Sequence, residues 1–134
     1  VVNGRIFHGA APGESEIGHL RLDRQGTTLE SQVSGWAVDG KVRALAAQHP
    51  DSVLAKLMAE AGTTGGEARF LGLALEQNDT LAQQLLAETA DTLAFGLSHA
   101  VHLFHPEIMI LGGGLSLLGD PLCEAVEAAL PNYL

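Results

Sequence analysis

Cysteine, basic residues and long apolar runs are all scarce in this chain of 134 residues. Cys123 is the only cysteine, which excludes an intrachain disulfide framework and fits a reducing compartment. Seven Lys and Arg stand against 16 Asp and Glu, and the net charge of −9 argues against binding to nucleic acid or to an anionic membrane surface. No apolar run reaches the roughly 18 residues of a membrane span, and no signal peptide is recognisable. We therefore expect a soluble, acidic, cytoplasmic protein.

What is present is enough apolar material for one folded domain. Hydrophobic residues make up 46% of the chain and charged residues 17%, a balance that excludes intrinsic disorder. The chain begins with Val1 rather than Met, and only two residues precede Asn3-Gly4, a strong signal for a hairpin turn. We therefore expect a single domain over residues 1–134 that is a fragment of a longer protein. A trimmed small domain is the alternative.

The spacing of apolar residues predicts several helices, one of them long. Leucines and alanines recur at helical intervals from Asp79 to about His105, where Pro106 follows. A helix of this length spans roughly 38 Å, enough to cross a domain. Shorter helices are predicted over residues 34–48, over 53–61 with Ser52 as N-cap and Gly62 at the end, from the capping-box spacing of Thr64 and Glu67 to about Gln77, and from Asp120-Pro121 with Asp120 as N-cap.

Three short segments predict strands. Residues 5–8 and the alternating residues 20–23 are two of them, with a loop over residues 9–18 between them. Residues 108–111 form an uninterrupted apolar run, which is typical of a strand buried on both faces. The expected fold class is therefore α/β.

Two segments carry candidate binding residues. Glu16 and His19 lie three positions apart in a glycine-braced loop, where a carboxylate and an imidazole can share one pocket and bind sugar hydroxyls; a solvated turn is the alternative. The Gly112–Gly114 triplet follows a predicted strand and precedes a helix, so its N–H groups can face an anion; a tight turn is the alternative. On local grounds Glu30 is a first-turn acid favoured by the helix dipole.

Metal binding is not expected from the distribution of ligand-type residues. His99, His102 and His105 have no clustered cysteines or acids beside them and are interpreted as helix-surface or packing residues. A structural zinc needs about four nitrogen or sulfur ligands, and no cysteine lies near His19. We expect no structural zinc, and another group should orient the His19 ring.

Residues 16–19 (Glu-Ile-Gly-His) and residues 104–114 (Phe-His-Pro-Glu-Ile-Met-Ile-Leu-Gly-Gly-Gly), together with the long predicted helix, resemble the ROK family of bacterial sugar kinases, such as glucokinase, and related transcriptional repressors. The first segment resembles the family signature Ala-Gly-Glu-x-Gly-His. The second resembles its Asn-Pro-Glu-x-Ile-x-x-Gly-Gly-Gly segment. Residues 2–5 with 9–10 also resemble the strand pair before the signature, so the resemblance covers nearly the whole chain.

The resemblance implies a ribonuclease H-like fold of the actin and hexokinase type, in which this chain is most of the C-terminal lobe. It implies that Glu16, His19 and Glu30 bind sugar hydroxyls. It implies an ATP site, used with Mg²⁺, that is lined by Gly112, Gly113 and Gly114. The catalytic base would lie upstream of Val1, so no catalytic residue is assigned and the chain alone is expected to be inactive. Because relatives are commonly dimers, a homodimer is expected.

Departures from the family pattern keep other functions open. Ser15 stands where the family usually has Gly, and only residues 27–29 separate Gly26 from Glu30, where many relatives carry a zinc-binding cysteine loop. The family's phosphate loop and its Asn-Asp pair are absent from the chain. The leading hypothesis is an ATP-dependent hexose kinase. The alternatives are the sugar-sensing domain of a ROK repressor and a non-catalytic sugar-binding relative, with glucose, fructose, mannose and N-acetylated hexosamines all open as sugars.

Overall fold

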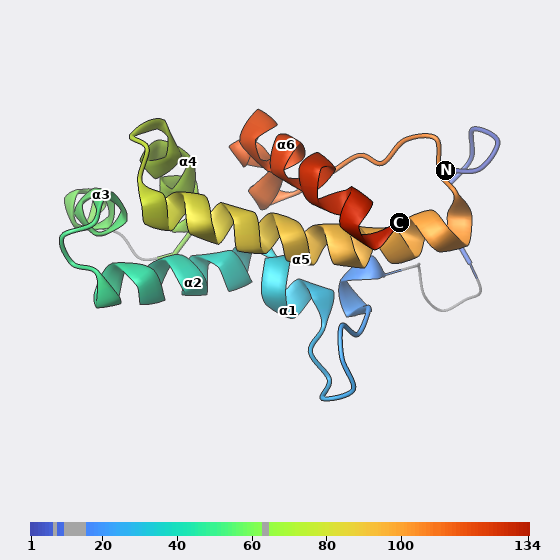
Figure 1. Cartoon of the computed structure of the whole chain (residues 1–134), viewed down its shortest axis with the longest axis horizontal. Coiled ribbons are helices and arrows are strands. Elements are labelled where there is room, and N and C mark those ends of the chain that lie inside the picture. The colour runs from blue at the N-terminus through green and yellow to red at the C-terminus, as the bar shows by residue number, and fades with distance from the viewer. Residues whose placement is uncertain (7, 10–15, 63–64) are drawn as a thin grey trace.

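The computed structural model of the chain describes residues 1–6, 8–9, 16–62 and 65–134. Its central element is the helix α5 (Thr80–Phe104), which runs along most of the length of the molecule in Figure 1. The other α-helices are α1 (Leu29–Val33), α2 (Gly35–Gln48), α3 (Val53–Ala61), α4 (Ala68–Glu76) and α6 (Asp120–Ala129). Helix α6 packs against α5 on one side, and α1 and α2 contact α5 on the opposite side.

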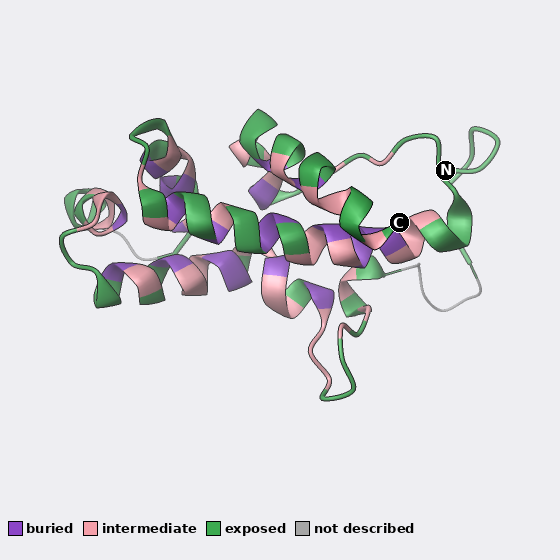
Figure 2. Cartoon of the chain, in the orientation of Figure 1, coloured by how far each residue is buried: buried purple, intermediate pink, exposed green. Residues whose placement is uncertain are grey.

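Helix α5 begins and ends where the sequence predicts. Asp79 caps its N-terminus, since the carboxylate accepts a hydrogen bond from Ala82 N at 2.9 Å. At the other end His105 adopts a left-handed conformation, with φ of 45°, and donates its N–H to the carbonyl of Val101. Buried residues recur along the helix from Ala82 to Ser98, and Figure 2 shows them as purple segments between exposed ones. The prediction of one long helix with an apolar face is confirmed.

The predicted helices over residues 34–48 and 53–61 are confirmed as α2 and α3. Ser34 and Ser52 cap them, accepting hydrogen bonds from backbone N–H groups at 3.3 and 3.1 Å. Gly62 ends α3 in the left-handed region, with φ of 60°, where a residue without Cβ is favoured.

The starts of α4 and α6 differ from their predictions. Thr64, the predicted cap of α4, lies outside the described residues, and Glu67 holds the N-cap position without a capping hydrogen bond of its own side chain. Gly119, with φ of 66°, holds the N-cap position of α6, so the helix begins one residue earlier than predicted. Asp120 lies in the first turn beside Pro121 instead of at the N-cap.

The turn predicted at Asn3-Gly4 is present. Both residues have positive φ, 51° and 74°, and Val2 and Arg5 exchange backbone hydrogen bonds of 2.8 and 3.0 Å across the turn. This is the pattern of a two-residue hairpin turn. In the described part of the predicted strand over residues 5–8, the isolated bridge between Val2 and Arg5 is the one β-bridge.

The predicted α/β class is seen only in its helices, because the described residues are mostly helical and form no extended strand ladder. Residues 20–23 contribute only an isolated bridge between Arg21 and Thr28. Residues 108–111 have no regular secondary structure, and Ile108 and Ile110 are 75% and 86% exposed. A strand needs a neighbour to take its backbone hydrogen bonds, and none of the described segments lies in that position.

One hydrophobic core joins α2, α3, α4, α5 and α6. It also includes Leu115 from the 3-10 helix η2 (Gly114–Leu118). Its largest fully buried apolar side chains are Leu54, Leu71, Leu122, Val38 and Val42. Burial of side chains of this size contributes roughly 1.5–3 kcal/mol each. Among the described residues, no helix is long and apolar enough to cross a membrane.

Candidate functional site

The short helix α1 determines where Glu30 lies, and Glu30 is in its first turn, as the local interpretation of the sequence expected. Thr28 and Ser31 form its capping box: Ser31 N donates to Thr28 Oγ1 at 3.3 Å, and Thr28 N donates to Ser31 Oγ at 3.2 Å. Leu29 is 2% exposed and lies against Gly96 of α5, where an added Cβ would be 2.6 Å from Leu29 Cδ2. Glu30, the next residue, is therefore carried by a short helix that is held directly against α5.

Glu16 and His19 belong to a single turn of 3-10 helix, η1 (Ile17–His19), with Glu16 at its N-cap position. The turn is closed by a hydrogen bond of 3.2 Å from His19 N to the carbonyl of Glu16. Gly18 lies against Glu30, and a Cβ there would be 3.2 Å from Glu30 Cβ. Ser15 and the rest of residues 10–15 lie outside the described residues.

Glu30 is the acidic side chain that lies beside the His19 ring. The distance from His19 Nε2 to Glu30 Oε1 is 3.6 Å, and the two side chains are 69% and 46% exposed. A contact this exposed contributes little to folding, and it is an ion pair only when His19 is protonated. Its consequence is geometric, because it brings together two side chains that are distant in the sequence and were both predicted to bind sugar.

Glu16 and His19 line one cavity of about 370 Å³ between η1 and the C-terminal part of α5. The wall from α5 consists of His99, Ala100, Leu103 and Phe104, and Ile17 and Leu20 complete the lining. We call this cavity the η1–α5 cavity. Glu30 does not line it and reaches it only through His19. The lining combines a carboxylate and two imidazoles with apolar surface, which suits a ligand that has both hydroxyl groups and C–H faces.

His99 is a polar group of this cavity that the sequence reasoning interpreted as a packing or surface residue. Its Nδ1 lies 2.9 Å from the carbonyl oxygen of Phe95, one helical turn earlier, and its ring contacts the Phe95 ring edge-on at 5.0 Å. His102 makes the equivalent contact with Ser98 at 2.7 Å but does not line the η1–α5 cavity. The sequence showed that His99 belongs to the long helix, but not that it lines the same cavity as Glu16.

The glycine triplet forms the turn into η2. Gly113 has a φ of 92°, and Ser116 donates both its N–H and its Oγ–H to the Gly113 carbonyl, at 3.2 and 2.7 Å. Apart from chain neighbours, no atom of the described residues lies within 4 Å of the position of an added Cβ on Gly112, Gly113 or Gly114. The tight turn that the sequence offered as an alternative is thus present, and the open side of the triplet remains accessible to a ligand.

A second cavity, of about 310 Å³, contains Gly114 but not Gly112 or Gly113. It lies between α2, α4 and η2, and we call it the glycine-lined cavity. Its lining residues are Gly35, Asp39, Gly66, Ala68, Arg69, Gly72, Gly114, Leu115, Leu117 and Leu118. Because four of them are glycines, backbone is exposed on several sides, and a flat ligand can approach it closely.

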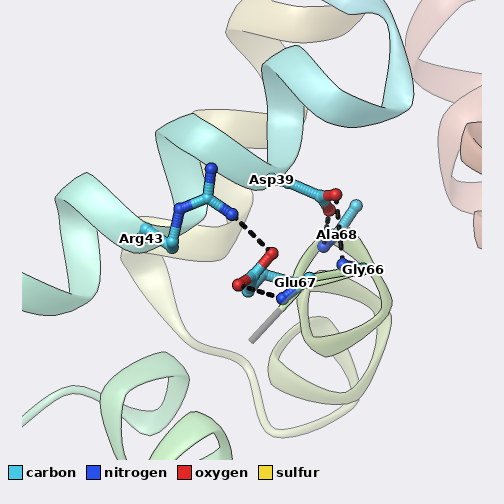
Figure 3. Close-up of polar contacts among 6 residues, drawn as sticks. Asp39, Arg43, Gly66, Glu67 and Ala68 are labelled. Atoms are coloured by element: carbon cyan, nitrogen blue, oxygen red, sulfur yellow. Dashed lines mark hydrogen bonds and ion pairs between the residues drawn. The ribbon is translucent and has the colours of Figure 1, made fainter. Parts of the chain in front are cut away.

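A polar network that the sequence did not predict holds one wall of the glycine-lined cavity (Figure 3). Asp39 of α2 accepts hydrogen bonds from Gly66 N at 3.2 Å and from Ala68 N at 2.6 Å, and so caps α4 from another helix. Glu67, 1% exposed, accepts from Gly65 N at 2.7 Å, and its other oxygen pairs with Arg43 at 2.7 Å. The two carboxylates fix α4 and residues 65–68 against α2.

The environment of Glu67 favours its charged form. Chiefly the hydrogen bond from Gly65 N–H, and also the Arg43 guanidinium, lower the pKa of its carboxyl from the ordinary value of 4.5, against the opposing effect of burial. The spacing of Thr64 and Glu67 predicts a capping box between these two residues. The partner of Glu67 in the structure, Arg43, is 24 residues away, a separation that no local pattern reveals.

The structure thus groups the predicted residues in two places, Glu16, His19 and Glu30 at one and Gly114 at the other. The η1–α5 cavity and the glycine-lined cavity share no lining residue. Within residues 1–6, 8–9, 16–62 and 65–134, no group of three His, Cys, Asp or Glu side chains is arranged to hold a metal ion. The absence of structural zinc stays a prediction.

The sequence profile of the ROK family matches residues 1–134. The glucokinase of Thermotoga maritima is 27% identical over 143 aligned positions, which cover 100% of this chain and 44% of that protein. The xylose repressor of Caldicellulosiruptor bescii is 22% identical, with 97% of this chain and 34% of the repressor covered. The chain therefore spans less than half the length of these relatives.

A solved structure has the same arrangement of elements. The ROK family glucokinase from Streptomyces griseus, crystallised in complex with glucose and AMPPNP, superposes with a TM-score of 0.83 over 97% of this chain and 45% of that one. At 24% identity, this match shows that the chain has part of the fold of a ROK kinase.

Proposed function

The chain belongs to the ROK family, and we propose that it is the C-terminal lobe of a longer, two-lobed hexose kinase that uses ATP. One observation carries this proposal: Glu16 and His19 line a single cavity, and Glu30 lies 3.6 Å from His19. Glucokinases among the relatives support the same reaction. We further propose a cytoplasmic, homodimeric enzyme of the ribonuclease H-like, actin and hexokinase-type fold.

Residues 108–111 support the proposal of a longer protein. Their sequence predicts a strand buried on both faces, whereas Ile108 and Ile110 are largely exposed in this structure. Pairing with strands of a longer protein would bury these two side chains and satisfy the backbone of the segment. The share of the relatives that the chain covers, 44% and 34% in the two described above, is consistent with this.

In the proposed reaction, the residues of this chain bind and orient the sugar. The Glu16 carboxylate accepts hydrogen bonds from sugar hydroxyls, and His19, held by Glu30, contributes a further donor or acceptor. Orientation matters because phosphoryl transfer depends mainly on positioning and on stabilisation of charge. The base that removes the hydroxyl proton would come from the upstream part of the longer protein.

For the nucleotide, we propose that the glycine-lined cavity and the Gly112–Gly114 turn form one side of the ATP site. The cavity exposes backbone at four glycines and is otherwise largely apolar, which suits the flat base and sugar of a nucleotide. The described residues do not form a Mg²⁺ site of their own. We therefore propose that the ATP phosphates bring the Mg²⁺ to this side of the site.

A ROK repressor is the second candidate function, and the similarity to a xylose repressor supports it. In that case the chain would be a sugar-sensing domain beside a DNA-binding domain. A non-catalytic sugar-binding relative is the third candidate. Both alternatives keep the sugar site and predict weak or absent ATP binding at the glycine-lined cavity, so nucleotide binding separates them from the kinase.

The test of the proposed sugar site is the Glu16→Ala variant of the full-length protein. Charge-assisted hydrogen bonds contribute roughly 1.5–3 kcal/mol, so sugar affinity should fall by roughly 10- to 150-fold. Affinity for AMPPNP should stay within about threefold, since Glu16 does not line the glycine-lined cavity. Isothermal titration with glucose, fructose, mannose and N-acetylglucosamine measures the first quantity, and titration with AMPPNP the second.

The matched control is Glu127→Ala, which removes an equivalent carboxylate from the exposed face of α6, away from both cavities. Both affinities should be those of the wild type in this variant. Unchanged sugar affinity in Glu16→Ala would show that Glu16 is a solvated loop acid and that the proposed sugar site is wrong.

A further inference from the structure

His99 is the one polar side chain that α5 contributes to the η1–α5 cavity. The other three lining residues from α5 are Ala100, Leu103 and Phe104, which offer only apolar surface. On the opposite wall, Glu16 and His19 supply polar groups. A ligand bound in this cavity therefore meets polar groups from two elements, η1 and α5, rather than from η1 alone.

The hydrogen bond of His99 determines what its ring can offer. Its Nδ1 lies 2.9 Å from the Phe95 carbonyl oxygen, which can only accept, so Nδ1 carries the hydrogen. In the neutral ring, Nε2 then has a free lone pair and acts as an acceptor. The edge-on contact with the Phe95 ring, at 5.0 Å, also restricts the orientation of the imidazole.

We infer that His99 is a third sugar-binding residue, whose Nε2 accepts a hydrogen bond from a sugar hydroxyl in the cavity that Glu16 and His19 line. This inference rests on the proposed sugar site and adds a specificity contact to it. A hydroxyl that donates to His99 still has oxygen lone pairs for a donor such as His19. An acceptor fixed in this way favours sugars that carry a hydroxyl at that position.

His102 provides a matched control for this inference. It lies three residues further along α5, and its Nδ1 contacts the carbonyl of Ser98 at 2.7 Å, as Nδ1 of His99 contacts Phe95. His102 lines only the neighbouring cavity, with Phe95, Ser98, Leu103 and Tyr133, whereas His99 lines both. An effect that comes only from removing an imidazole from this part of α5 should therefore appear equally when His99 or His102 is replaced by alanine.

The experiment compares His99→Ala, His99→Gln and His102→Ala in the full-length protein. The probe is whichever of glucose, fructose, mannose and N-acetylglucosamine binds the wild type most tightly by isothermal titration. His99→Ala should weaken its binding by roughly 5- to 10-fold, as expected for one neutral hydrogen bond, while His102→Ala stays within about twofold. His99→Gln, whose amide oxygen can accept the same hydroxyl, should recover part of the loss.

A set of monodeoxy derivatives of that sugar provides a readout that a purely structural role would not change. The wild type should bind one derivative markedly more weakly than the parent sugar. That derivative lacks the hydroxyl that donates to His99 Nε2, so Nε2 is left without a partner. In His99→Ala, the difference between this derivative and the parent sugar should shrink by the same 5- to 10-fold, roughly, as the hydrogen bond is already absent.

The outcomes separate this inference from the proposed function. If Glu16→Ala loses sugar affinity and His99→Ala does not, His99 is a packing residue and the proposed sugar site stands. Equal losses in His99→Ala and His102→Ala, or unchanged discrimination among the deoxy sugars, also overturn the inference. If the wild type binds none of the four sugars, the proposed function fails, and the inference fails with it.

Discussion

Replacing Gly96 with alanine tests whether the contact between α5 and α1 is as close as the structure shows. An added Cβ would lie 2.6 and 2.7 Å from Cδ2 and Cδ1 of Leu29, and 3.2 Å from its Cγ. Leu29 is 2% exposed, so its side chain has little space into which it can move. Overpacking of a well-packed core costs roughly 1–3 kcal/mol.

A second effect of Gly96→Ala has the opposite sign. Alanine in a helix interior is favoured over glycine by about 0.5–1 kcal/mol, because the unfolded chain has less freedom to lose. With three heavy atoms of Leu29 in the way, the steric cost should exceed this gain. We expect the free energy of unfolding to decrease by about 1–2 kcal/mol, measured by urea denaturation of the variant and the wild type.

The control is Gly40→Ala in α2, where Arg43 Nη2, at 3.9 Å, is the one atom of the described residues outside the helix's own nearby backbone that lies within 4 Å of the added Cβ. Here the helix preference acts alone and should stabilise the fold by about 0.5–1 kcal/mol. A double-mutant cycle with Leu29→Ala should also relieve the cost of Gly96→Ala. If Gly96→Ala is as stable as Gly40→Ala, the contact is looser than described and α1 is not held by it.

The remaining predictions concern the polar network and metal content. Because the pKa of Glu67 is lowered from 4.5, its charge stabilises the fold above that pH, and this contribution is lost as the pH falls through the lowered value; thermal unfolding followed from about pH 7 to 3 should lose this part of its pH dependence in Glu67→Gln. Asp39→Ala should destabilise the fold by about 1 kcal/mol in urea denaturation, with partial recovery in Asp39→Asn, whereas equal losses would argue against a capping role. Elemental analysis of the purified protein should find no stoichiometric zinc, and finding it would contradict the role given to Glu30 at His19.

The sequence predicted the longer helices well because their boundaries are set locally. Asp79 and Ser52 cap the helices that follow them, and His105 and Gly62 end helices through their own backbone conformation. Each of these signals involves residues within four positions of one another. The sequence therefore contains all the information that such a boundary requires.

Strands and the binding cavity depend on distant residues, and here the predictions were wrong or incomplete. Residues 108–111 have the composition of a buried strand, but a strand forms only where another segment pairs with it. The contact of His19 with Glu30 joins positions 11 residues apart. His99 lines the same cavity as Glu16 because α1 contacts both α5 and η1. The residue types of Glu16 and His19 suggested hydrogen bonding to sugar hydroxyls. Their spacing in the sequence could not reveal that His99 lines the same cavity.

Ligand binding at the two cavities differs in how well it distinguishes a kinase from a repressor or a non-catalytic relative. A kinase, a repressor and a non-catalytic relative all need a site that binds sugar, so sugar affinity alone does not distinguish among them. The glycine-lined cavity does, because only a kinase needs it to bind ATP while sugar is bound. Asp39 holds residues 66–68 in the wall of this cavity without contributing to the η1–α5 cavity. If the protein is a kinase, Asp39→Ala should therefore raise the KM for ATP and leave sugar affinity unchanged. If it is a repressor, sugar affinity should again be unchanged in this variant, but there should be no ATP turnover.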